Sequence, residues 1–412
     1  MGTIRDFSER LLSGAASTLD HNPMAPVLAV EEVAPRAAFV SSFSNVTAVD
    51  TDEGLLLVDT GSHFLAEANK ALVRSYSSRR LHTVLFTHGH ADHVFGVDLY
   101  EAEGGRARVL AHEAVPRRFE RYRMTRGYNT CINARQFRVT GEFPVDFRFP
   151  DQCFAGGLTI EVGGERVEIH HALGETDDHA WAFLPGKRLL CTGDLFIWAT
   201  PNAGNPQKVQ RYPREWAVAL RAMAALDAEA MCPGHGPPIL GVDRVKQALT
   251  ETAELLESLV AQTLALMNEG ARLDAILDAV KAPAHLLERP YLRPVYDEPE
   301  FVVRNVWRLY GGWWDGDPAN LKPARAAAVA REMAALAGSA TKLAERAGDL
   351  VGKGDLALAC HLAEMAWLAA PGDAGIAKVR SAVYARRAAA ETSLMARGVF
   401  RAAAKESEPK GS

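Results

Sequence analysis

The chain has 412 residues, of which 48% are hydrophobic and 24% are charged, and its formal net charge is −5. This is the composition of a packed globular protein, and the length suggests two domains. The acidic balance, without a long basic run, argues against nucleic-acid binding. The sequence contains no run of about 18 uncharged apolar residues, so no membrane span is expected.

The N-terminal residues 1–6 contain no apolar signal region, and the 5 cysteines are scattered without a C-x-x-C pair. We therefore expect neither secretion nor a disulfide framework. The expected compartment is the cytoplasm.

Residues 1–27 are predicted to form a helix or an arm that leads into the fold. The short apolar runs that follow, bounded by turn residues, predict an antiparallel meander of β-strands. These strands are expected at 27–30, 37–40, 45–49 and 55–58, with a turn at 52–54 before the last one. Residues 64–80 have the spacing of an amphipathic helix.

The most informative stretch follows the apolar run 84–86, which reads as a buried strand. The sequence continues His88-x-His90-x-Asp92-His93. Three imidazoles and a carboxylate in so short a stretch cannot all be core side chains, and both groups are common metal ligands. At a strand end, His88 and His90 would reach one ion, while Asp92 and His93 would point towards a second. A histidine-rich surface loop is the alternative.

This motif resembles that of the metallo-β-lactamase superfamily, which implies an α/β fold, the αββα sandwich, with two metals. In the resemblance, Asp194 ends the segment Thr192-Gly193-Asp194 as the ligand that bridges both ions. His235, in Pro233-Gly234-His235-Gly236, resembles the last ligand of the second metal. Asp59, in a strand-ending Asp-Thr-Gly, is expected to orient the ligand loop, and a plain turn aspartate is the alternative.

The third ligand of the first metal is expected after a hairpin of residues 158–162 and 166–170. Many superfamily members carry Pro-Gly-His-Thr there, and by position Glu175 replaces that histidine. His170, His171 and His179 are rival ligands. The resemblance then implies one metal on His88, His90, Glu175 and Asp194, and another on Asp92, His93, Asp194 and His235. Two zinc ions are expected, with iron or manganese as alternatives.

Residues 113–138 are rich in arginine, tyrosine and asparagine, and arginines near the mouth of a metal site would suit an anionic substrate. For most of these arginines a solvated helix face is the better interpretation. Arg126, Tyr128 and Arg135 are singled out as candidate substrate-binding residues.

From residue 243 onward, alanine, leucine, glutamate and arginine recur at helical spacing. We therefore predict a catalytic domain at 1–242 and an all-α domain at 243–412. The aromatic-rich stretch 296–321 resembles the helical dimerisation domain of alkylsulfatases, the superfamily enzymes that hydrolyse dodecyl sulfate and related esters. Glutamate at position 175 also resembles their arrangement. Later helices, around 325–352, 354–370 and 373–404, look like TPR-type pairs, and an unrelated bundle is the alternative.

Three features depart from typical alkylsulfatases. We expect no C-terminal domain resembling a sterol-carrier protein, because the chain given ends at residue 412. Asp194 stands where those enzymes have a bridging glutamate. Gln207 stands near the position of an arginine that helps to hold sulfate, so Asn202, Lys208 and Arg211 are the candidates for that task.

The resemblance implies a homodimeric hydrolase that cleaves sulfuric esters of small molecules with an apolar portion. Its nucleophile would be a metal-bridged hydroxide, with Asp92 and Asp194 in catalytic roles. The alternative is a carboxylic ester, lactone or thioester hydrolase. The loss of the sulfate-binding arginine and the expected lack of the third domain both favour this alternative. A non-hydrolytic interaction protein and an iron-dependent oxygenase are more distant alternatives, and metal analysis separates the oxygenase from the hydrolases.

Overall fold

The structure is a computed structural model that describes residues 4–22, 24–25 and 27–408, and it divides into two compact units. The first unit holds the described residues of 1–129, 142–271 and 275–312. The second holds those of 130–141, 272–274 and 313–412. Within the described chain, no helix has the length and apolar character needed to cross a bilayer.

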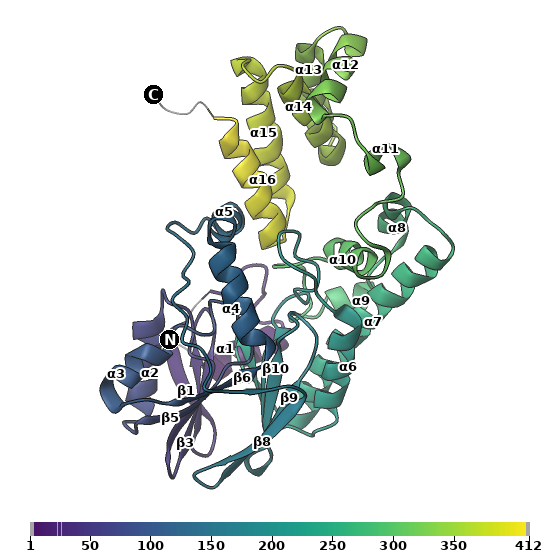
Figure 1. The fold of residues 1–412 in the computed structure, drawn as a ribbon. Helices are drawn as coiled ribbons and strands as arrows, with labels where there is room; N and C mark the ends of the chain where they lie inside the picture. Colours follow the sequence, from purple (N-terminus) through teal and green to yellow (C-terminus); the bar gives the residue numbers. More distant parts are fainter. Residues whose placement is uncertain (1–3, 23, 26, 409–412) are drawn as a thin grey trace. The chain divides into compact units, whose positions relative to one another are not determined.

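A seven-stranded sheet forms the first half of the larger unit, with its strands in sequence order (Figure 1). Its first four strands are antiparallel, as the meander prediction requires, and the later strands run parallel. The strands are β1 (Ala29–Ala34), β2 (Ala37–Ser41), β3 (Val46–Thr51), β4 (Gly54–Val58), β5 (Leu81–Leu85), β6 (Arg108–His112) and β7 (Gln152–Phe154).

A six-stranded sheet faces the first, in the order β13-β12-β11-β10-β9-β8. The predicted hairpin is present, and it turns at Gly163 and Gly164, whose positive φ angles of 52° and 84° favour glycine. Only β11 and β12 pair in parallel. The strands are β8 (Gly157–Val162), β9 (Glu165–His171), β10 (Ala180–Leu184), β11 (Leu189–Ile197), β12 (Ala230–His235) and β13 (Ile239–Leu240).

Three buried hydrophobic clusters fix the order of the layers. One lies between the two sheets and includes Phe39, Leu56 and Ile169. A second covers the outer face of the first sheet with helices α2 (Ala66–Tyr76), α3 (Val97–Gly104) and α4 (Ala114–Met124). The third covers the second sheet with α6 (Pro213–Ala224) and α7 (Val242–Asn268). The unit is therefore an αββα sandwich, which confirms the predicted fold class.

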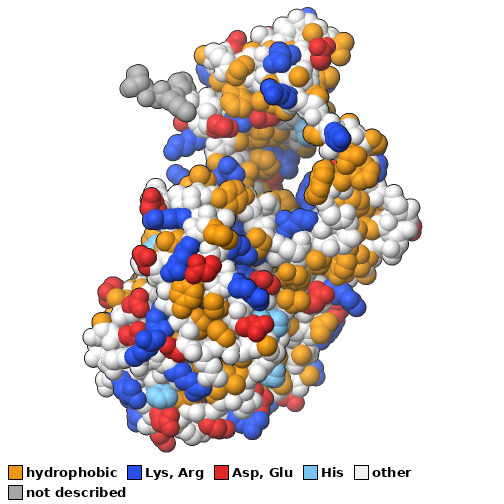
Figure 2. Space-filling model, in the orientation of Figure 1, with side chains coloured by type: hydrophobic (Ala, Val, Ile, Leu, Met, Phe, Trp, Pro, Cys, Tyr) orange, Lys and Arg blue, Asp and Glu red, His pale blue; other side chains and the backbone are white. Residues whose placement is uncertain are grey.

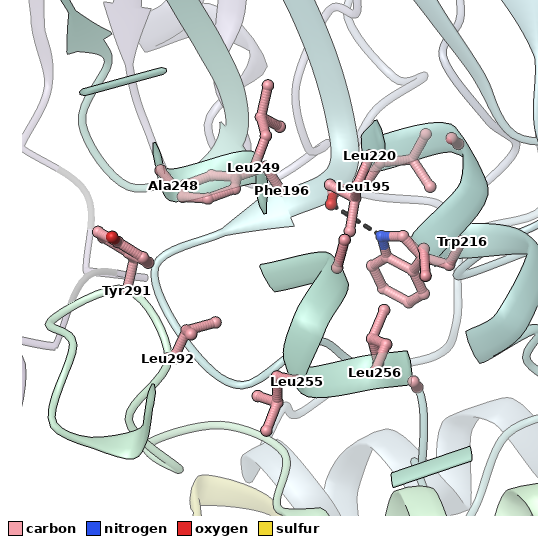
Figure 3. Close-up of a cluster of buried hydrophobic side chains, with 14 of the residues drawn as sticks. Leu195, Phe196, Trp216, Leu220, Ala248, Leu249, Leu255, Leu256, Tyr291 and Leu292 are labelled. Atoms are coloured by element: carbon pink, nitrogen blue, oxygen red, sulfur yellow. Dashed lines mark hydrogen bonds between the residues drawn. The ribbon is translucent and has the colours of Figure 1, made fainter. Parts of the chain in front are cut away.

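Helix α6 was not predicted, and its Trp216 anchors the third cluster (Figure 3). The indole is fully buried, and its Nε1 donates a hydrogen bond of 2.8 Å to the carbonyl oxygen of Leu195 in β11. Burial of so large an aromatic side chain stabilises this contact strongly. Because Leu195 directly follows Asp194, the contact also fixes the strand that carries a predicted ligand.

The change of composition at residue 243 coincides with the start of α7 at Val242. The first compact unit nevertheless extends to residue 312. The division into compact units therefore does not coincide with the predicted boundary at 242/243 and does not test it. That boundary stays a prediction. The remaining helices outside the sandwich layers are α1 (Ile4–Leu12), η1 (Pro185–Lys187), α5 (Arg126–Phe137), α8 (Leu273–Ala279), α9 (Ala284–Leu287) and α10 (Pro299–Gly311).

The second compact unit is helical, as predicted, but two of its expected helices are each divided. Gly338, with a φ of 94°, ends one helix, and the Ser339 side chain caps the next. Ser393 likewise caps the last helix. The helices are α11 (Pro318–Leu321), α12 (Ala326–Ala337), α13 (Ala340–Gly352), α14 (Leu356–Ala369), α15 (Ala374–Ala390) and α16 (Leu394–Glu406).

Candidate metal centre

The site lies where parallel strands of both sheets deliver polar residues. Strand β5 is followed by the loop that carries His88, His90, Asp92 and His93. In the second sheet, Asp194 lies within β11 and His235 ends β12. Because parallel neighbours end at the same edge of a sheet, their polar side chains gather there.

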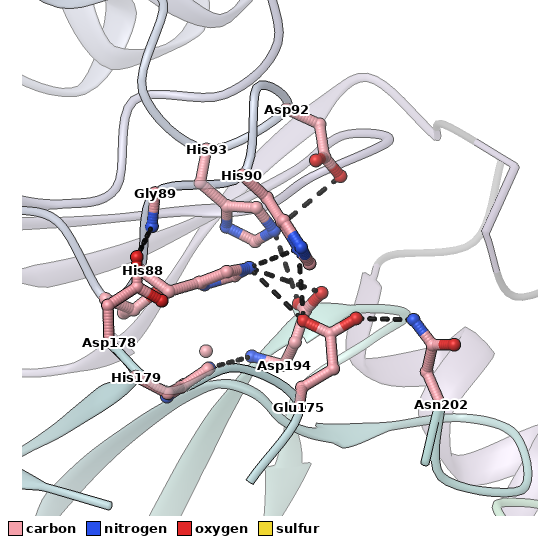
Figure 4. Close-up of polar contacts among 12 residues, drawn as sticks. His88, Gly89, His90, Asp92, His93, Glu175, Asp178, His179, Asp194 and Asn202 are labelled. Carbon is pink, nitrogen blue, oxygen red and sulfur yellow. Dashed lines mark hydrogen bonds and ion pairs between the residues drawn. The ribbon is translucent and has the colours of Figure 1, made fainter. Parts of the chain in front are cut away.

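The first group of side chains joins His88, His90, Glu175 and Asp194 (Figure 4). The Nε2 atom of His88 lies 2.8 Å from Nδ1 of His90 and 3.4 Å from Oε2 of Glu175. Nδ1 of His90 lies 3.1 Å from the same glutamate oxygen. Oδ2 of Asp194 lies 3.8 Å from His88 Nε2.

The second group joins Asp92, His93 and His235, and Asp194 borders it as well. Nε2 of His93 lies 3.6 Å from Oδ2 of Asp92 and 3.3 Å from Oδ1 of Asp194. Nε2 of His235 lies 3.4 Å from Oδ2 of each of these two aspartates. The structure thus brings all seven predicted ligands together.

These separations fit divalent metal ions. A tetrahedral ion bound at 2.0–2.2 Å holds its ligand atoms roughly 3.3–3.6 Å apart, which lies within the observed range. Glu175 Oε2 and Asp194 Oδ1 are buried, and neither makes a hydrogen bond among the described residues. Buried carboxylate oxygens without hydrogen bonds are costly, and metal cations would compensate them. Imidazole and carboxylate are also the donor types that such ions prefer.

The rival histidines have other partners. His179 Nε2 accepts a hydrogen bond of 3.1 Å from the backbone N–H of Asp194. His171 Nε2 lies 3.0 Å from the carbonyl oxygen of Asp177, and the His170 ring stacks on Trp181. Glu175 alone of these candidates stands in the first group.

Asp59 supports the second group from outside. Its Oδ2 accepts hydrogen bonds from His93 Nδ1 at 2.8 Å and from Thr87 Oγ1 at 2.7 Å, and its Oδ1 accepts one from the Thr87 backbone at 2.7 Å. A carboxylate on the far nitrogen fixes the orientation of a ligand imidazole. Asp59 therefore orients His93 and the start of the ligand loop, as expected from its position.

The pKa shifts of His88 and Glu175 favour the forms that bind metals, whereas neighbouring carboxylates outweigh burial and raise the pKa of His93 and His235. Burial, with the neighbouring imidazoles of His93 and His90, holds the pKa of His88 well below its usual value. Burial alone would raise the pKa of Glu175, but His90 and Arg211 outweigh it and lower that pKa. A neutral imidazole and an ionised carboxylate are the forms that bind metals.

Asn202, Lys208 and Arg211 stand in the segment that lies beside the first group. Asn202 Nδ2 donates a hydrogen bond to Glu175 Oε1, and Arg211 Nη2 lies 3.5 Å from the same oxygen. Arg211 is only 1% exposed, yet its Nε and Nη1 atoms have no hydrogen-bond partner in the described chain. Burial and the nearby charge of Arg211 lower the pKa of Lys208 to about 8.

The other predicted substrate residues do not join the ligand groups. Arg126 makes an ion pair with Glu142, and Tyr128 is 60% exposed. Arg135 belongs to the second compact unit. Substrate contacts by these three residues stay predictions.

Arg118 was missed among the arginines assigned to a solvated face. It is 2% exposed and pairs with Asp177 and Asp178, and Asp178 also accepts a hydrogen bond of 3.2 Å from the Gly89 backbone. Arg118 thus ties the histidine loop to the Glu175 loop. The sequence does contain a sign that Arg118 is buried. Its helical spacing places position 118 on the apolar face of α4 with Val115, Phe119 and Tyr122.

Comparison with known proteins agrees with this architecture. The model of the metallo-beta-lactamase superfamily matches residues 41–235, and the model described as alkyl sulfatase dimerisation matches residues 272–410. Residues 41–235 thus belong to the metallo-β-lactamase superfamily. Its second half carries the dimerisation domain found in alkylsulfatases.

Several curated relatives are alkylsulfatases. A linear primary-alkylsulfatase of Pseudomonas sp. is 30% identical over 76% of this chain and 64% of that protein. An (R)-specific secondary-alkylsulfatase of Pseudomonas sp. is 26% identical over 77% of this chain and 53% of that protein. The chain thus spans between about half and two thirds of these relatives' length.

The fold also matches a solved structure. A stereoselective inverting sec-alkylsulfatase from Pseudomonas sp. superposes with a TM-score of 0.83 at 21% identity. The match covers 93% of this chain and 66% of that one. At this identity the likeness establishes the shared fold.

Replacing one ligand tests the centre. We expect His90→Ala to lose bound metal and hydrolytic activity, because it removes a donor from the first group, while the oligomeric state stays unchanged. Metal content by plasma emission spectroscopy and light scattering measure both. His82→Ala, in β5 of the same segment but outside both groups, is the control and keeps its metal. A His90→Ala protein with full metal content and activity would contradict the assignment.

Proposed function

We propose that this protein is a binuclear metal-dependent hydrolase of sulfuric monoesters with an apolar alkyl portion, like its relatives. The observation that carries the proposal is Arg211. A permanently charged guanidinium lies buried beside the metal groups with two nitrogens unpartnered among the described residues. Buried charges are normally paired, so this one supports an anionic ligand at the site.

The charge balance supports an anionic substrate. The seven ligands include three carboxylates and four imidazoles, so two divalent ions would leave a charge of +1 before a nucleophilic hydroxide is added. That hydroxide would make the cluster nearly neutral, so the positive charge that faces a substrate comes from Arg211 and, below pH 8, from Lys208. A sulfuric monoester, which is negatively charged at neutral pH, would be attracted by both side chains.

The residues around the two ligand groups have distinct roles in this mechanism. Arg211, Asn202 and Lys208 would hold the head group, and Arg211 is suited to bidentate recognition of its oxygens. Asp194 lies between the two ligand groups and would fix the position of one group relative to the other. Asp92 is the most accessible ligand, with its side chain 28% exposed, and marks the open side of the site. Divalent ions held here would supply Lewis acidity and an activated water.

Zinc is the metal we propose, because histidine and carboxylate donors at this spacing suit its tetrahedral geometry. Iron and manganese accept the same donors. On the face shown in Figure 2, basic side chains are interspersed with acidic ones, which supports a small-molecule substrate rather than a nucleic acid. All 5 cysteines are free, which supports the predicted cytoplasmic location.

The direct test compares substrates of matched chain length: dodecyl sulfate, a p-nitrophenyl ester and a lactone. We expect chelator-sensitive sulfate release, and about 100-fold lower kcat/KM in Arg211→Met, because removal of one preorganised charged donor costs about that much. Arg211→Lys keeps the charge and recovers part of the rate. Ester or lactone cleavage without sulfate release would instead favour the carboxylic ester, lactone or thioester hydrolase.

The affinity for sulfate esters should depend on pH through Lys208. Its pKa of about 8 means that the ammonium is charged below pH 8 and becomes neutral above it. We therefore expect KM for dodecyl sulfate to rise between pH 7 and about 9. In Lys208→Arg, whose side chain does not titrate in this range, this rise in KM disappears. Identical KM profiles for the two proteins would exclude the role of Lys208.

We also propose that the protein forms a homodimer through residues 243–335, with Trp313 and Trp314 at the interface. Helix α12 exposes an apolar stripe of Val329, Met333 and Leu336, and Leu336 is 82% exposed. Light scattering at micromolar concentration should give the mass of a dimer, and Leu336→Glu should weaken it. Arg331→Glu, an exposed site outside the stripe, serves as control. A monomeric wild-type peak would contradict the dimer.

A further inference from the structure

We propose that α10 and the residues just before it position the anion-binding loop, residues 201–212, and thereby set the affinity for the head group. Asp297, Asn305 and Arg308 are the positioning residues, and none of them belongs to a metal-ligand group. This inference rests on the proposed role of Arg211 as the anion-binding side chain. Helix α10 lies in the region matched by the dimerisation model, so part of that region would support the anion-binding loop of the same chain.

The first attachment joins Asp297 to the start of the loop. Asp297 is fully buried, and its Oδ2 accepts a hydrogen bond of 2.7 Å from the backbone N–H of Gly204. Its Oδ1 accepts a second one of 2.7 Å from the backbone of Glu298. Both carboxylate oxygens are therefore used, and an amide in place of the carboxylate could accept only one of these bonds.

Gly204 shows how tightly the loop meets the helix. A Cβ atom at this position would lie 2.2 Å from the carbonyl carbon of Phe301 and 2.3 Å from the nitrogen of Val302. Both neighbours are backbone atoms in the first turns of α10, so neither can move aside cheaply. The loop is thus pressed against the start of α10, and only glycine fits.

The second attachment lies at Arg211 itself. Asn305, which is 5% exposed, donates from Nδ2 to the Arg211 carbonyl oxygen at 3.0 Å. The Gln210 amide donates to the same carbonyl at 2.8 Å and to Asn305 Oδ1 at 3.1 Å. Arg308 completes the network with bonds of 2.9 Å to Gln210 Oε1 and 3.0 Å to Asn305 Oδ1. A connected network of this kind holds its members rigidly.

The backbone after Arg211 is held from the other side as well. The N–H of Tyr212 donates a hydrogen bond of 2.9 Å to the carbonyl oxygen of Gly174, the residue before Glu175. The Arg211 backbone therefore lies between the Glu175 loop and α10. A long side chain on a fixed backbone loses less entropy when it binds a ligand, so the supports should raise affinity rather than change the chemical step.

The test measures steady-state kinetics of full-length, zinc-loaded variants on dodecyl sulfate. Asn305→Leu keeps the branched shape of the side chain but removes both its donor and its acceptor, and with them three hydrogen bonds of the network. We expect KM to rise at least about tenfold, because one well-placed hydrogen bond alone is worth about that much, with kcat within about twofold and metal content unchanged. Partial unfolding would instead lower kcat and leave KM alone. The exposed Arg304→Ala, on α10, is the matched control and should keep wild-type KM.

A second measurement does not need activity. Hydrogen–deuterium exchange of the same variants should show faster exchange of amides in residues 203–212 in Asn305→Leu, with β11 unchanged. Unchanged exchange there together with wild-type KM would overturn the positioning role. A wild-type protein that releases no sulfate would reject the proposed function, and the exchange result would then decide the positioning role by itself.

Discussion

The structure depends on the electrostatic cost of gathering three carboxylates and four imidazoles in one largely buried volume. Without compensation, buried carboxylates repel one another and lose their hydration. The histidines offset part of that cost, and His235 and His93 hold the pKa of Asp194 well below its usual value. Divalent cations held by these residues would offset the remainder and so let the fold concentrate acidic groups where its strands end.

The surrounding scaffold serves to hold this cluster still. Asp59 and Thr87 fix the histidine loop from the first sheet, and Arg118 ties that loop to the Glu175 loop. Trp216 secures β11 directly after Asp194. These partners hold three different segments that carry ligands, so they would preorganise the ligand geometry. Such outer contacts usually affect metal affinity as strongly as a weak ligand does.

The side chain proposed to bind the head group is also held by contacts from outside the site. Arg211 is a buried cation whose position is set by main-chain contacts to two separate segments, the Glu175 loop and α10. In the proposed function, reaction chemistry and head-group recognition thus come from different parts of the sequence.

The sequence predicts the sandwich through its resemblance to the superfamily, and its short motifs mark the seven side chains that the structure brings together as candidate ligands. Strands appear as short apolar runs between turn residues, and the ligands follow strands in short motifs. Even Glu175 could be placed by its position after the hairpin. The order of the meander strands follows from their spacing, since short connections make sequential strands neighbours.

Other features could not be predicted because their meaning depends on contacts distant in sequence. Asp297 and Asn305 meet their partners across 93 and 94 residues, and nothing near them marks that role. The helical spacing of Arg118 indicates burial, but nothing in the local sequence marks its two aspartate partners, which lie 59 and 60 residues away. The divided helices of the second unit escaped prediction because alanine-rich sequence continues across the break at Gly338 with little change of pattern.

The central claim is that the two groups around Asp194 hold two metal ions. Anomalous diffraction at the zinc absorption edge, from crystals of zinc-loaded protein, tests it most directly. We expect two strong peaks, one between His88, His90 and Glu175 and the other between Asp92, His93 and His235, with Asp194 beside both. A single peak, or peaks away from these residues, would contradict it.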